Sequence, residues 1–189
     1  METVVAGIDL AASPKKCSGY SVIESKNNSP FLTKIKCLNT NKSIVNEILK
    51  DGVRVVAIDS PLTKEPKMRE VDRLMIKRGF RVFPPNFSWM RELSVRGWLI
   101  AEELKSLGIK VIETHPRSAL VAAGVNSLQE LLDLLEVRIT VSNFSESVLH
   151  KDLRDSVIAA IVAYCYIRGC CDAVKASDGI IYILKKFRN

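Results

Sequence analysis

Three short apolar runs in this chain each end in an acidic residue. The runs cover residues 4–8, 53–58 and 109–112, and the acids that follow them are Asp9, Asp59 and Glu113. Short runs rich in β-branched residues are typical of strands that are buried on both faces of a sheet. Parallel strands bring their carboxyl ends to one edge of an open α/β sheet, where ligand sites usually form. The pattern therefore predicts an α/β fold with three acidic side chains at one edge of its sheet.

A second acidic feature opens the last long helical pattern, at about residues 148–168. Asp152 and Asp155 are three residues apart, so both can lie on one face of that helix. Negative charge near a helix N-terminus is favourable in itself, and an acid after a strand is often only a cap or turn former. Neither interpretation excludes a role as a ligand.

Carboxylates that are held together repel one another unless a cation or a proton neutralises them. Oxygen ligands favour Mg²⁺ or Mn²⁺, and two such ions can act together on a phosphodiester. We therefore predict a site for two of these ions, with the following ligands: Asp9, Asp59, Glu113, Asp152 and Asp155.

Both histidines of the chain lie close to these acids. His115 follows Glu113 by two residues, and His150 precedes Asp152 by two. Each imidazole could make a structural hydrogen bond, or it could shuttle protons or support a ligand in catalysis. We keep both possibilities and include the two histidines among the candidate catalytic residues.

The chain is basic, with 28 Lys and Arg against 21 Asp and Glu and a net charge of +7. Such a charge fits either a cationic surface or a polyanionic partner. A basic amphipathic helix is expected at residues 66–78, and its cations are Lys67, Arg69, Arg73, Lys77 and Arg78. These side chains could contact the phosphates of a nucleic acid or form only a solvated face. Phe87 and Trp89, which follow, could stack on a base or belong to the core.

Several other classes of protein are disfavoured. The chain has no glycine-rich phosphate loop, and its five cysteines and two histidines contain no Cys-x-x-Cys pair that would indicate zinc. We expect the thiols to be reduced. No stretch approaches 18 uninterrupted apolar residues, and no secretory signal pattern is present, so we expect a cytoplasmic protein without a membrane partner.

The order of elements predicts one domain over residues 1–189. Strands at 3–10, 19–24 and 31–38 should form an antiparallel meander, and a helix from 41 or 43 to 51 should connect it to the strand at 53–59. A helical insertion is expected at about 61–90, followed by helices at 87–107, after His115, and at 127–136 and 148–168. We expect a five-stranded mixed sheet in the order 3-2-1-4-5, flanked by helices.

Four short motifs occur in order along the chain. They are Gly-Ile-Asp-Leu-Ala at 7–11, Ile-Asp-Ser-Pro-Leu at 58–62, Glu-Thr-His-Pro-Arg at 113–117 and His-Lys-Asp-Leu-Arg-Asp-Ser at 150–156. This set resembles the predicted nuclease family of ribonuclease H-like fold that was first catalogued as domain of unknown function 429. Arg69 and Asp72, before Gly79 and Phe83, also resemble that family. The last motif resembles the metal-binding end of RuvC-type junction resolvases, although Ser156 stands where alanine is usual.

The resemblance implies a metal-dependent nuclease that hydrolyses phosphodiester bonds in DNA or RNA with two Mg²⁺ or Mn²⁺ ions. One alternative is a non-catalytic nucleic-acid-binding or scaffold protein that keeps the fold, and another is a phosphohydrolase of small metabolites. ATP-dependent kinases and chaperones of this fold need glycine-rich phosphate loops, which are missing here. The choice between DNA and RNA and the oligomeric state stay open.

Overall fold

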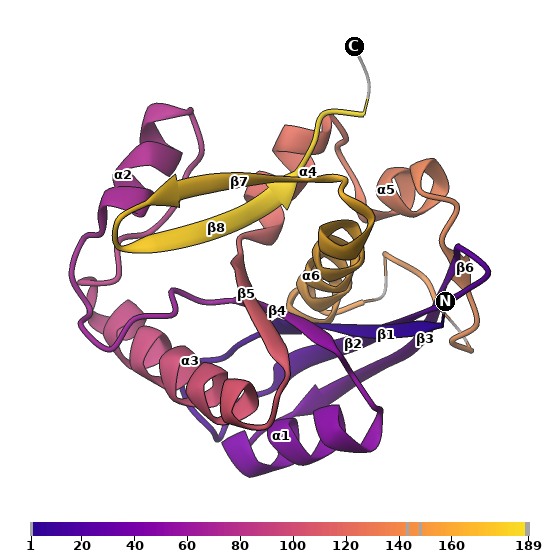
Figure 1. Cartoon of the computed structure of the whole chain (residues 1–189), viewed down its shortest axis with the longest axis horizontal. Helices are drawn as coiled ribbons and strands as arrows, with labels where there is room; N and C mark the ends of the chain where they lie inside the picture. The colour runs from indigo at the N-terminus through magenta and orange to yellow at the C-terminus, as the bar shows by residue number, and fades with distance from the viewer. Residues whose placement is uncertain (1, 143, 148, 188–189) are drawn as a thin grey trace.

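The fold consists of one mixed sheet with helices on both of its faces (Figure 1). A computed structural model describes residues 2–142, 144–147 and 149–187. Its strands are β1 (Thr3–Asp9), β2 (Ser18–Lys26), β3 (Ser29–Leu38), β4 (Val55–Asp59), β5 (Lys110–Thr114), β6 (Arg138–Ile139), β7 (Cys171–Ala176) and β8 (Gly179–Leu184). Its helices are α1 (Asn41–Lys50), α2 (Glu70–Lys77), α3 (Ser88–Ser106), α4 (Pro116–Ala123), α5 (Leu128–Leu134) and α6 (Lys151–Arg168).

The described sheet has eight strands in the order β6-β3-β2-β1-β4-β5-β8-β7. β1, β2 and β3 form the antiparallel meander, and β1, β4 and β5 are parallel neighbours, so the predicted order 3-2-1-4-5 is confirmed. The predicted number of five strands is wrong, because the β7–β8 hairpin extends the sheet beyond β5 and the two-residue β6 pairs with β3. The hairpin was missed because only the β8 half carries an apolar run.

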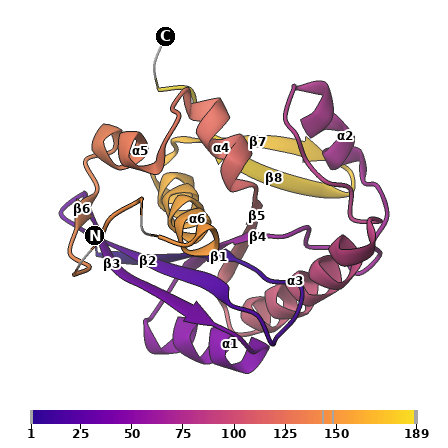
Figure 2. The same cartoon turned by 180° about the vertical axis from the view of Figure 1, so that it is seen from behind.

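Alternate residues of the central strands face two different helical layers. Val5 of β1 and Ala57 of β4 pack in one apolar cluster with α4, α5 and α6. Ala6 and Ile58 pack in a second cluster with α1 and α3 on the opposite face. Figure 2 shows these two layers from behind. Because side chains alternate along a strand, the face of each strand-end residue follows directly from its neighbours.

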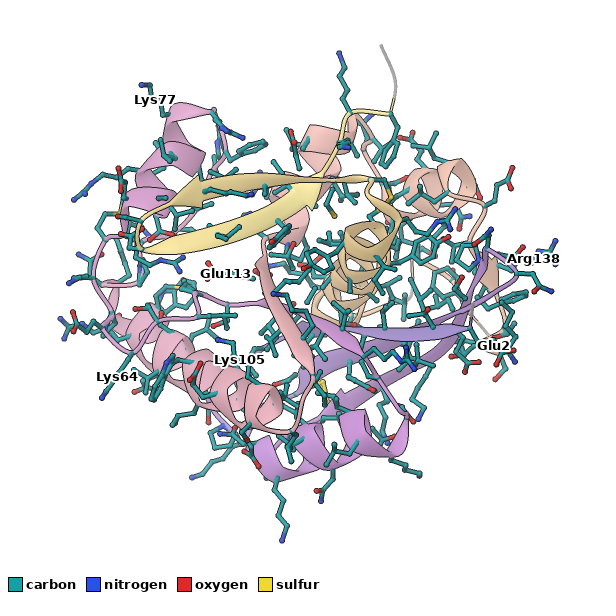
Figure 3. The ribbon with its side chains drawn as sticks, viewed as in Figure 1. Glu2, Lys64, Lys77, Lys105, Glu113 and Arg138 are labelled. Carbon is teal, nitrogen blue, oxygen red and sulfur yellow. A yellow bond between two sulfur atoms is a disulfide. The ribbon has the colours of Figure 1, made fainter. Side chains whose placement is uncertain are left out.

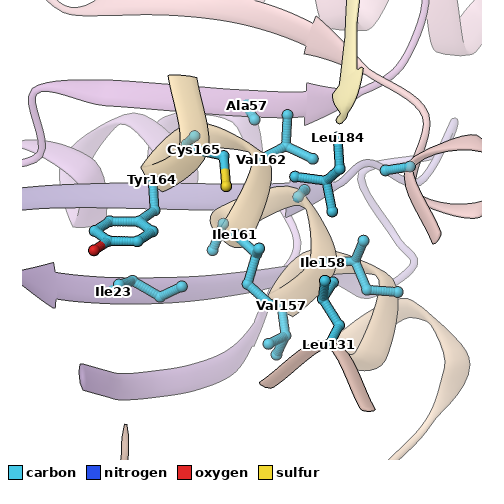
Figure 4. Close-up of a cluster of buried hydrophobic side chains, with 14 of the residues drawn as sticks. Ile23, Ala57, Leu131, Val157, Ile158, Ile161, Val162, Tyr164, Cys165 and Leu184 are labelled. Atoms are coloured by element: carbon cyan, nitrogen blue, oxygen red, sulfur yellow. The ribbon is translucent and has the colours of Figure 1, made fainter. Parts of the chain in front are cut away.

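Helix α6 supplies much of the core on its side of the sheet. Val157, Ile158, Ile161 and Val162 are fully buried, and Figure 4 shows them among side chains of the sheet and of α5. Each such side chain contributes about 1.5–3 kcal/mol through burial. The helix stops at Gly169, which adopts a left-handed conformation with φ 73°. This apolar surface fixes α6 against the sheet and so fixes the acids in its first turns.

Two glycines let the start of α6 lie directly against the strands. A Cβ on Gly7 of β1 would lie 2.0 Å from the backbone nitrogen of Ala160 and 2.2 Å from the carbonyl oxygen of Ser156. A Cβ on Gly19 of β2 would lie 2.0 Å from the carbonyl oxygen of Asp152. Any larger residue would push the helix away. The two glycines therefore bring the first turns of α6 over the carboxyl end of β1.

Helix α2 is shorter than the expected helix at 66–78. It begins after Arg69, whose backbone is extended, because Pro66 and the residues around it form a loop. Its apolar side, including Val71 and Met75, packs on Val174 and Ile181 of the β7–β8 hairpin. The helix is thus fixed against strands that the sequence analysis did not anticipate.

The cysteines differ from expectation. Disulfides join Cys17 to Cys37 and Cys165 to Cys170, and Cys171 is a free thiol. The pairing of β2 with β3 brings Cys17 and Cys37 together across 20 residues of sequence, which spacing alone does not reveal. Within the described ranges, no helix combines the length and apolar character needed to cross a membrane.

Candidate active site

A cavity of about 700 Å³ lies at the carboxyl ends of β1, β4 and β5, next to the start of α6. Its walls include four carboxylates that the sequence analysis singled out. They are Asp9, Asp59, Glu113 and Asp155. Cavities of roughly this size hold small ligands in many proteins. The sheet edge that the sequence indicated is therefore hollowed and carries carboxylates.

The three strand-end acids do not occupy equivalent positions. Asp9 pairs directly with Asp59 in the parallel register, and the residue opposite Asp59 on β5 is Thr114. Glu113 pairs instead with Ile58, one residue earlier. A shift of one residue turns a side chain to the other face of a sheet. Asp9 and Asp59 therefore share the face of Val5 and Ala57, which α6 covers, whereas Glu113 has the alternation of the opposite face.

Glu113 is held in a buried ion pair with Arg69. The guanidinium donates from Nη1 to Oε2 of Glu113 at 2.8 Å and from Nη2 to Oε1, and the N–H of Leu62 donates to Oε2 at 2.9 Å. Nη2 and Nε of Arg69 also donate to Asp72, at 2.7 and 3.0 Å. Burial alone would lower the pKa of Arg69, but its bonds to the two carboxylates raise it above the usual value. Both oxygens of Glu113 are thus engaged by protein donors.

Burial also raises the pKa of Glu113, although the bonds from Arg69 and Leu62 oppose that rise. At Asp9 and Asp59, neighbouring negative charges reinforce the effect of burial instead. Burial raises the pKa of Asp9 to about 8, with further contributions from the negative charges of Asp155 and Asp152. Burial likewise raises the pKa of Asp59 well above its usual value, and the charges of Asp9 and Asp155 add to the effect. Among the described residues, no cationic side chain forms an ion pair with either aspartate. The two carboxylates therefore repel each other and attract a proton or a cation.

Asp155 brings cations with it from α6. Lys151 Nζ lies 3.9 Å from Oδ2 of Asp155, and Arg154 Nε lies 3.5 Å from Oδ1. This Nε is buried and has no hydrogen-bond partner within the described part of the chain. A buried N–H without a partner is costly and suits an anionic ligand. Asp152 raises the pKa of Asp9, but the side chain itself does not line the cavity.

The two histidines differ in position, because His115 lines the cavity and His150 does not. His115 lines the cavity and caps α4, where its Nδ1 accepts from the N–H of Ser118 at 3.3 Å and lies 2.7 Å from the Ser118 hydroxyl oxygen. Burial lowers the pKa of His115 to about 4, and the charges of Arg117 and Lys151 lower it further. His150 has a side chain that is 74% exposed, lies 3.4 Å from Asp152 and does not line the cavity. Neither position provides a buried, readily protonated base.

Of the five cations in the predicted basic run, only Arg69 lines the cavity. The expectation that Arg69 belongs to an exposed phosphate-binding patch is wrong, because its side chain is only 3% exposed and is bound by two carboxylates. Lys67 pairs with Glu65 in solvent, and Arg73, Lys77 and Arg78 are exposed and do not line the cavity. Figure 3 shows Lys77 pointing outward, away from Glu113.

Other cations line the cavity in their place. They are Arg81, Arg117, Lys151 and Arg154. Sequence reasoning passed over them because they are scattered along the chain instead of forming a run. A usable signal was present, however. Lys151 and Arg154 flank Asp152 in the first turn of α6, and Arg117 ends the motif at 113–117.

The residues present fit a divalent cation only in part. Asp9, Asp59 and Asp155 offer hard oxygen ligands on one side of the cavity, and burial raises the pKa of all three. Of these, Asp155 also has Lys151 and Arg154 close by. Glu113 fits less well, because both of its oxygens already accept hydrogen bonds from Arg69. Within the described residues, no three His, Cys, Asp or Glu side chains stand in an arrangement that could hold a metal. The predicted metal site thus stays a prediction, with Glu113 as the ligand least suited to it.

Comparison with solved structures identifies the fold. A T. thermophilus RuvC in complex with a Holliday junction substrate has a TM-score of 0.54 and 14% identity, over 88% of this chain and 96% of that chain. A second Thermus thermophilus RuvC structure has a TM-score of 0.51 and 15% identity, over 88% and 97%. No protein-family model and no curated protein matches the chain. At these identities the likeness shows the predicted ribonuclease H-like fold, and membership of domain of unknown function 429 stays a prediction.

Proposed function

We propose that this protein is a metal-dependent nuclease that hydrolyses phosphodiester bonds in DNA or RNA with two Mg²⁺ or Mn²⁺ ions. The observation that carries the proposal is the pairing of Asp9 and Asp59 on one face of the sheet, beside Asp155. Neither of the pair has an ion pair with a cation in the part of the chain that the structure describes. Burying neighbouring carboxylates is unfavourable because they repel each other, and a bound cation would offset this repulsion. The similar RuvC structures, one of them bound to a Holliday junction, support a nucleic acid as the partner.

In this proposal Asp9, Asp59 and Asp155 hold the ions, and Asp152 completes the set from the same face of α6. When bound, such ions lower the pKa of an attacking water and stabilise the leaving oxygen of a phosphodiester. Lys151, Arg154 and Arg117 line the same cavity and bind the phosphate oxygens of the substrate.

His115 has a narrower role than a general base. Because Nδ1 accepts a hydrogen bond from the N–H of Ser118, the proton of the neutral ring belongs on Nε2. The low pKa keeps the ring neutral at physiological pH. His115 therefore positions α4 and offers one N–H donor to the cavity, and proton removal is left to water or to the carboxylates.

A second candidate follows from the dimensions of the cavity. A volume of about 700 Å³ suits one nucleotide or another small phosphorylated molecule as well as it suits a single unit of a polymer. A phosphohydrolase of small metabolites would use the same carboxylates and cations. The two candidates differ in whether a polymer is cleaved.

The test is cleavage in Mn²⁺ of a panel of single-stranded, duplex and branched DNA and RNA, together with mononucleotides. Asp9→Asn and Asp59→Asn should each abolish cleavage, a loss of at least a hundredfold, because an amide keeps the shape but not the charge. Asp172→Asn is a matched control, since Asp172 is an exposed strand residue outside the cavity.

Each outcome separates the candidates. Cleavage of a polymer that depends on Asp9 and Asp59 but not on Asp172 supports the nuclease. Cleavage of mononucleotides alone supports the metabolite phosphohydrolase. Tight binding of nucleic acid without cleavage by the wild type would contradict both and favour a scaffold. Equal cleavage by wild type and Asp9→Asn would place the activity outside this site.

A further inference from the structure

The exposed aromatic side chains of this protein gather in one place. The chain has six Phe, four Tyr and two Trp, all within the described ranges, and only three of them are exposed. Phe83, Phe87 and Trp89 are 60%, 55% and 48% exposed. Scattered apolar residues on a surface need no explanation, but large rings gathered together and left in water usually mark a binding site.

The three rings form an ordered cluster. The ring centroids of Phe83 and Trp89 lie 5.6 Å apart and those of Phe83 and Phe87 lie 6.4 Å apart, both with edge-on geometry. The backbone beneath them is fixed, because Phe87 donates its N–H to Pro84 and accepts from Arg91 in the first turn of α3. Edge-on packing leaves ring faces free for another flat group.

The aromatic cluster adjoins the carboxylates. Phe83 and Trp89 line the same cavity as Asp9 and Asp59, and Arg81 lines it two residues before Phe83. The cavity thus has a charged side, formed by the acids and by Lys151 and Arg154 on α6, and an aromatic side formed by Phe83 after α2 and Trp89 in the first turn of α3. A nucleotide has the same division, since its phosphate is charged and its base is flat and apolar on both faces.

We propose that Phe83, Phe87 and Trp89 form a stacking surface for an unpaired nucleobase of the strand that enters the carboxylate cavity. This inference rests on the proposed function and specifies its substrate class. A base within a duplex has both faces covered by its neighbours, so only an unpaired or splayed base can stack on these rings. The substrate is therefore a nucleic acid that is single-stranded or unpaired at the site of cleavage.

The surrounding charge favours a nucleic acid over a protein partner on these rings. Arg81 and Arg91 are exposed beside the cluster, and Arg117 and Lys151 are exposed on the cavity wall. Cations around an aromatic patch suit a polyanion with stacked bases. A second copy of this chain would bring the same positive charges into contact, which would oppose association.

The test compares binding of a 12-nucleotide oligothymidine with binding of a blunt duplex, in EDTA, by fluorescence anisotropy. The double substitution Phe83→Leu with Trp89→Leu keeps an apolar surface but removes the π faces. It should weaken single-strand binding about 5- to 100-fold, the range expected for base–aromatic stacking, and leave duplex binding unchanged. Leu99→Ala is the control, because Leu99 is a similarly exposed apolar residue of α3 outside the cavity.

A direct readout comes from Trp89 itself. In a Trp98→Phe background, the fluorescence of Trp89 should be quenched by the oligothymidine and not by the duplex. Equal binding by wild type and double variant, or equal quenching by both nucleic acids, would overturn the stacking surface. A change in oligomeric state of the double variant without a change in binding would overturn it in favour of a contact between copies.

This experiment is independent of the cleavage assay. If the wild type cleaves no substrate but the double variant loses single-strand binding, the stacking surface is supported and the proposed nuclease activity is contradicted. If cleavage depends on Asp9 but is unaffected by the double substitution, the proposed nuclease activity is supported and the stacking surface is contradicted. Melting curves of each variant establish that the exposed substitutions leave the fold intact.

Discussion

Two sets of carboxylates face one cavity in this protein and have opposite electrostatic states. Glu113 and Asp72 surround Arg69, and every charge in that group has a partner within hydrogen-bond distance. Asp9 and Asp59 lie side by side, and burial and mutual repulsion raise their pKa values. The first set has a cation within the protein, whereas the second attracts a proton or a cation.

The difference shows that a shared position in the sequence pattern does not give a shared role. Asp59 and Glu113 each end a buried parallel strand, yet a register offset of one residue directs them to different neighbours. One of them meets the start of α6 with its further acids, and the other meets an arginine at the start of α2. Position brings an acid to the sheet edge, and the neighbouring elements then decide what that acid can do.

The largest expected effect comes from breaking the neutralised set. Arg69→Ala would leave Glu113 and Asp72 buried without their partner, which typically costs about 3–5 kcal/mol of unfolding free energy. Urea denaturation at pH 7 measures this as a lower midpoint with an unchanged slope. Lys77→Ala, an exposed change on the same helix, should stay within about 0.5 kcal/mol. A loss no larger than that of Lys77→Ala would show that the ion pair does not hold this wall of the cavity.

The second prediction concerns pH and the repelling set. In metal-free protein the pKa of Asp9 is about 8, against 3.8 when unfolded, so the folded state holds more protons between these values. The free energy of unfolding should therefore fall as pH rises from 5 to 7, by up to about 1.4 kcal/mol per unit for this one group. Asp59 acts in the same direction.

Asp9→Asn should flatten this slope, because the amide does not titrate. Urea midpoints at pH 5, 6 and 7 in EDTA provide the measurement, and Asp172→Asn should keep the wild-type slope. A wild-type stability that rises over this range, or a variant that follows the wild type, would show that Asp9 and Asp59 already have a counterion within the protein.

The smallest effect is expected on the outer face of α2. Replacing Arg73, Lys77 and Arg78 together with Ala should change stability by less than about 0.5 kcal/mol per site and leave nucleic-acid binding nearly intact, because none of the three lines the cavity. Arg117→Ala with Lys151→Ala should instead weaken binding to all sequences and reduce the slope of log K against log salt by about 0.7 per lost phosphate contact on a single strand. If the triple variant of α2 weakened binding more than the double variant did, the outer face of α2 would be the surface that contacts phosphates.

Much of the fold was predictable because it depends on local patterns. The apolar runs of β1 and β4, which end in Asp9 and Asp59, and the helical spacing in α6 are visible in the sequence itself. The fate of Glu113 did not follow, because a one-residue register offset is set by pairing with β4 and not by the strand itself. Arg69 looked like one cation among five, and only its packing against β5 shows that it is buried.

The β7–β8 hairpin escaped prediction, and the sequence left open whether Phe87 and Trp89 are exposed or belong to the core, for a similar reason. The six residues of β7 alternate only weakly in hydrophobicity, so they form a strand because they pair with β8. Phe83, Phe87 and Trp89 have the composition of core residues, and their exposure depends on how the segment after α2 lies over the cavity. Long-range packing decided both outcomes.

The close approach of α6 to Gly7 and Gly19 also determines at which stage of synthesis the acids of the cavity can come together. Asp9 and Asp59 leave the ribosome early, but Asp155 joins them only after the 18-residue α6 has been made and has docked against β1 and β2. Synthesis proceeds from the N-terminus, so a chain made only as far as β4 carries Asp9 and Asp59 but none of the acids, lysine or arginine that α6 contributes. A chain in which α6 has not yet formed would therefore lack Asp155, Lys151 and Arg154 at the cavity.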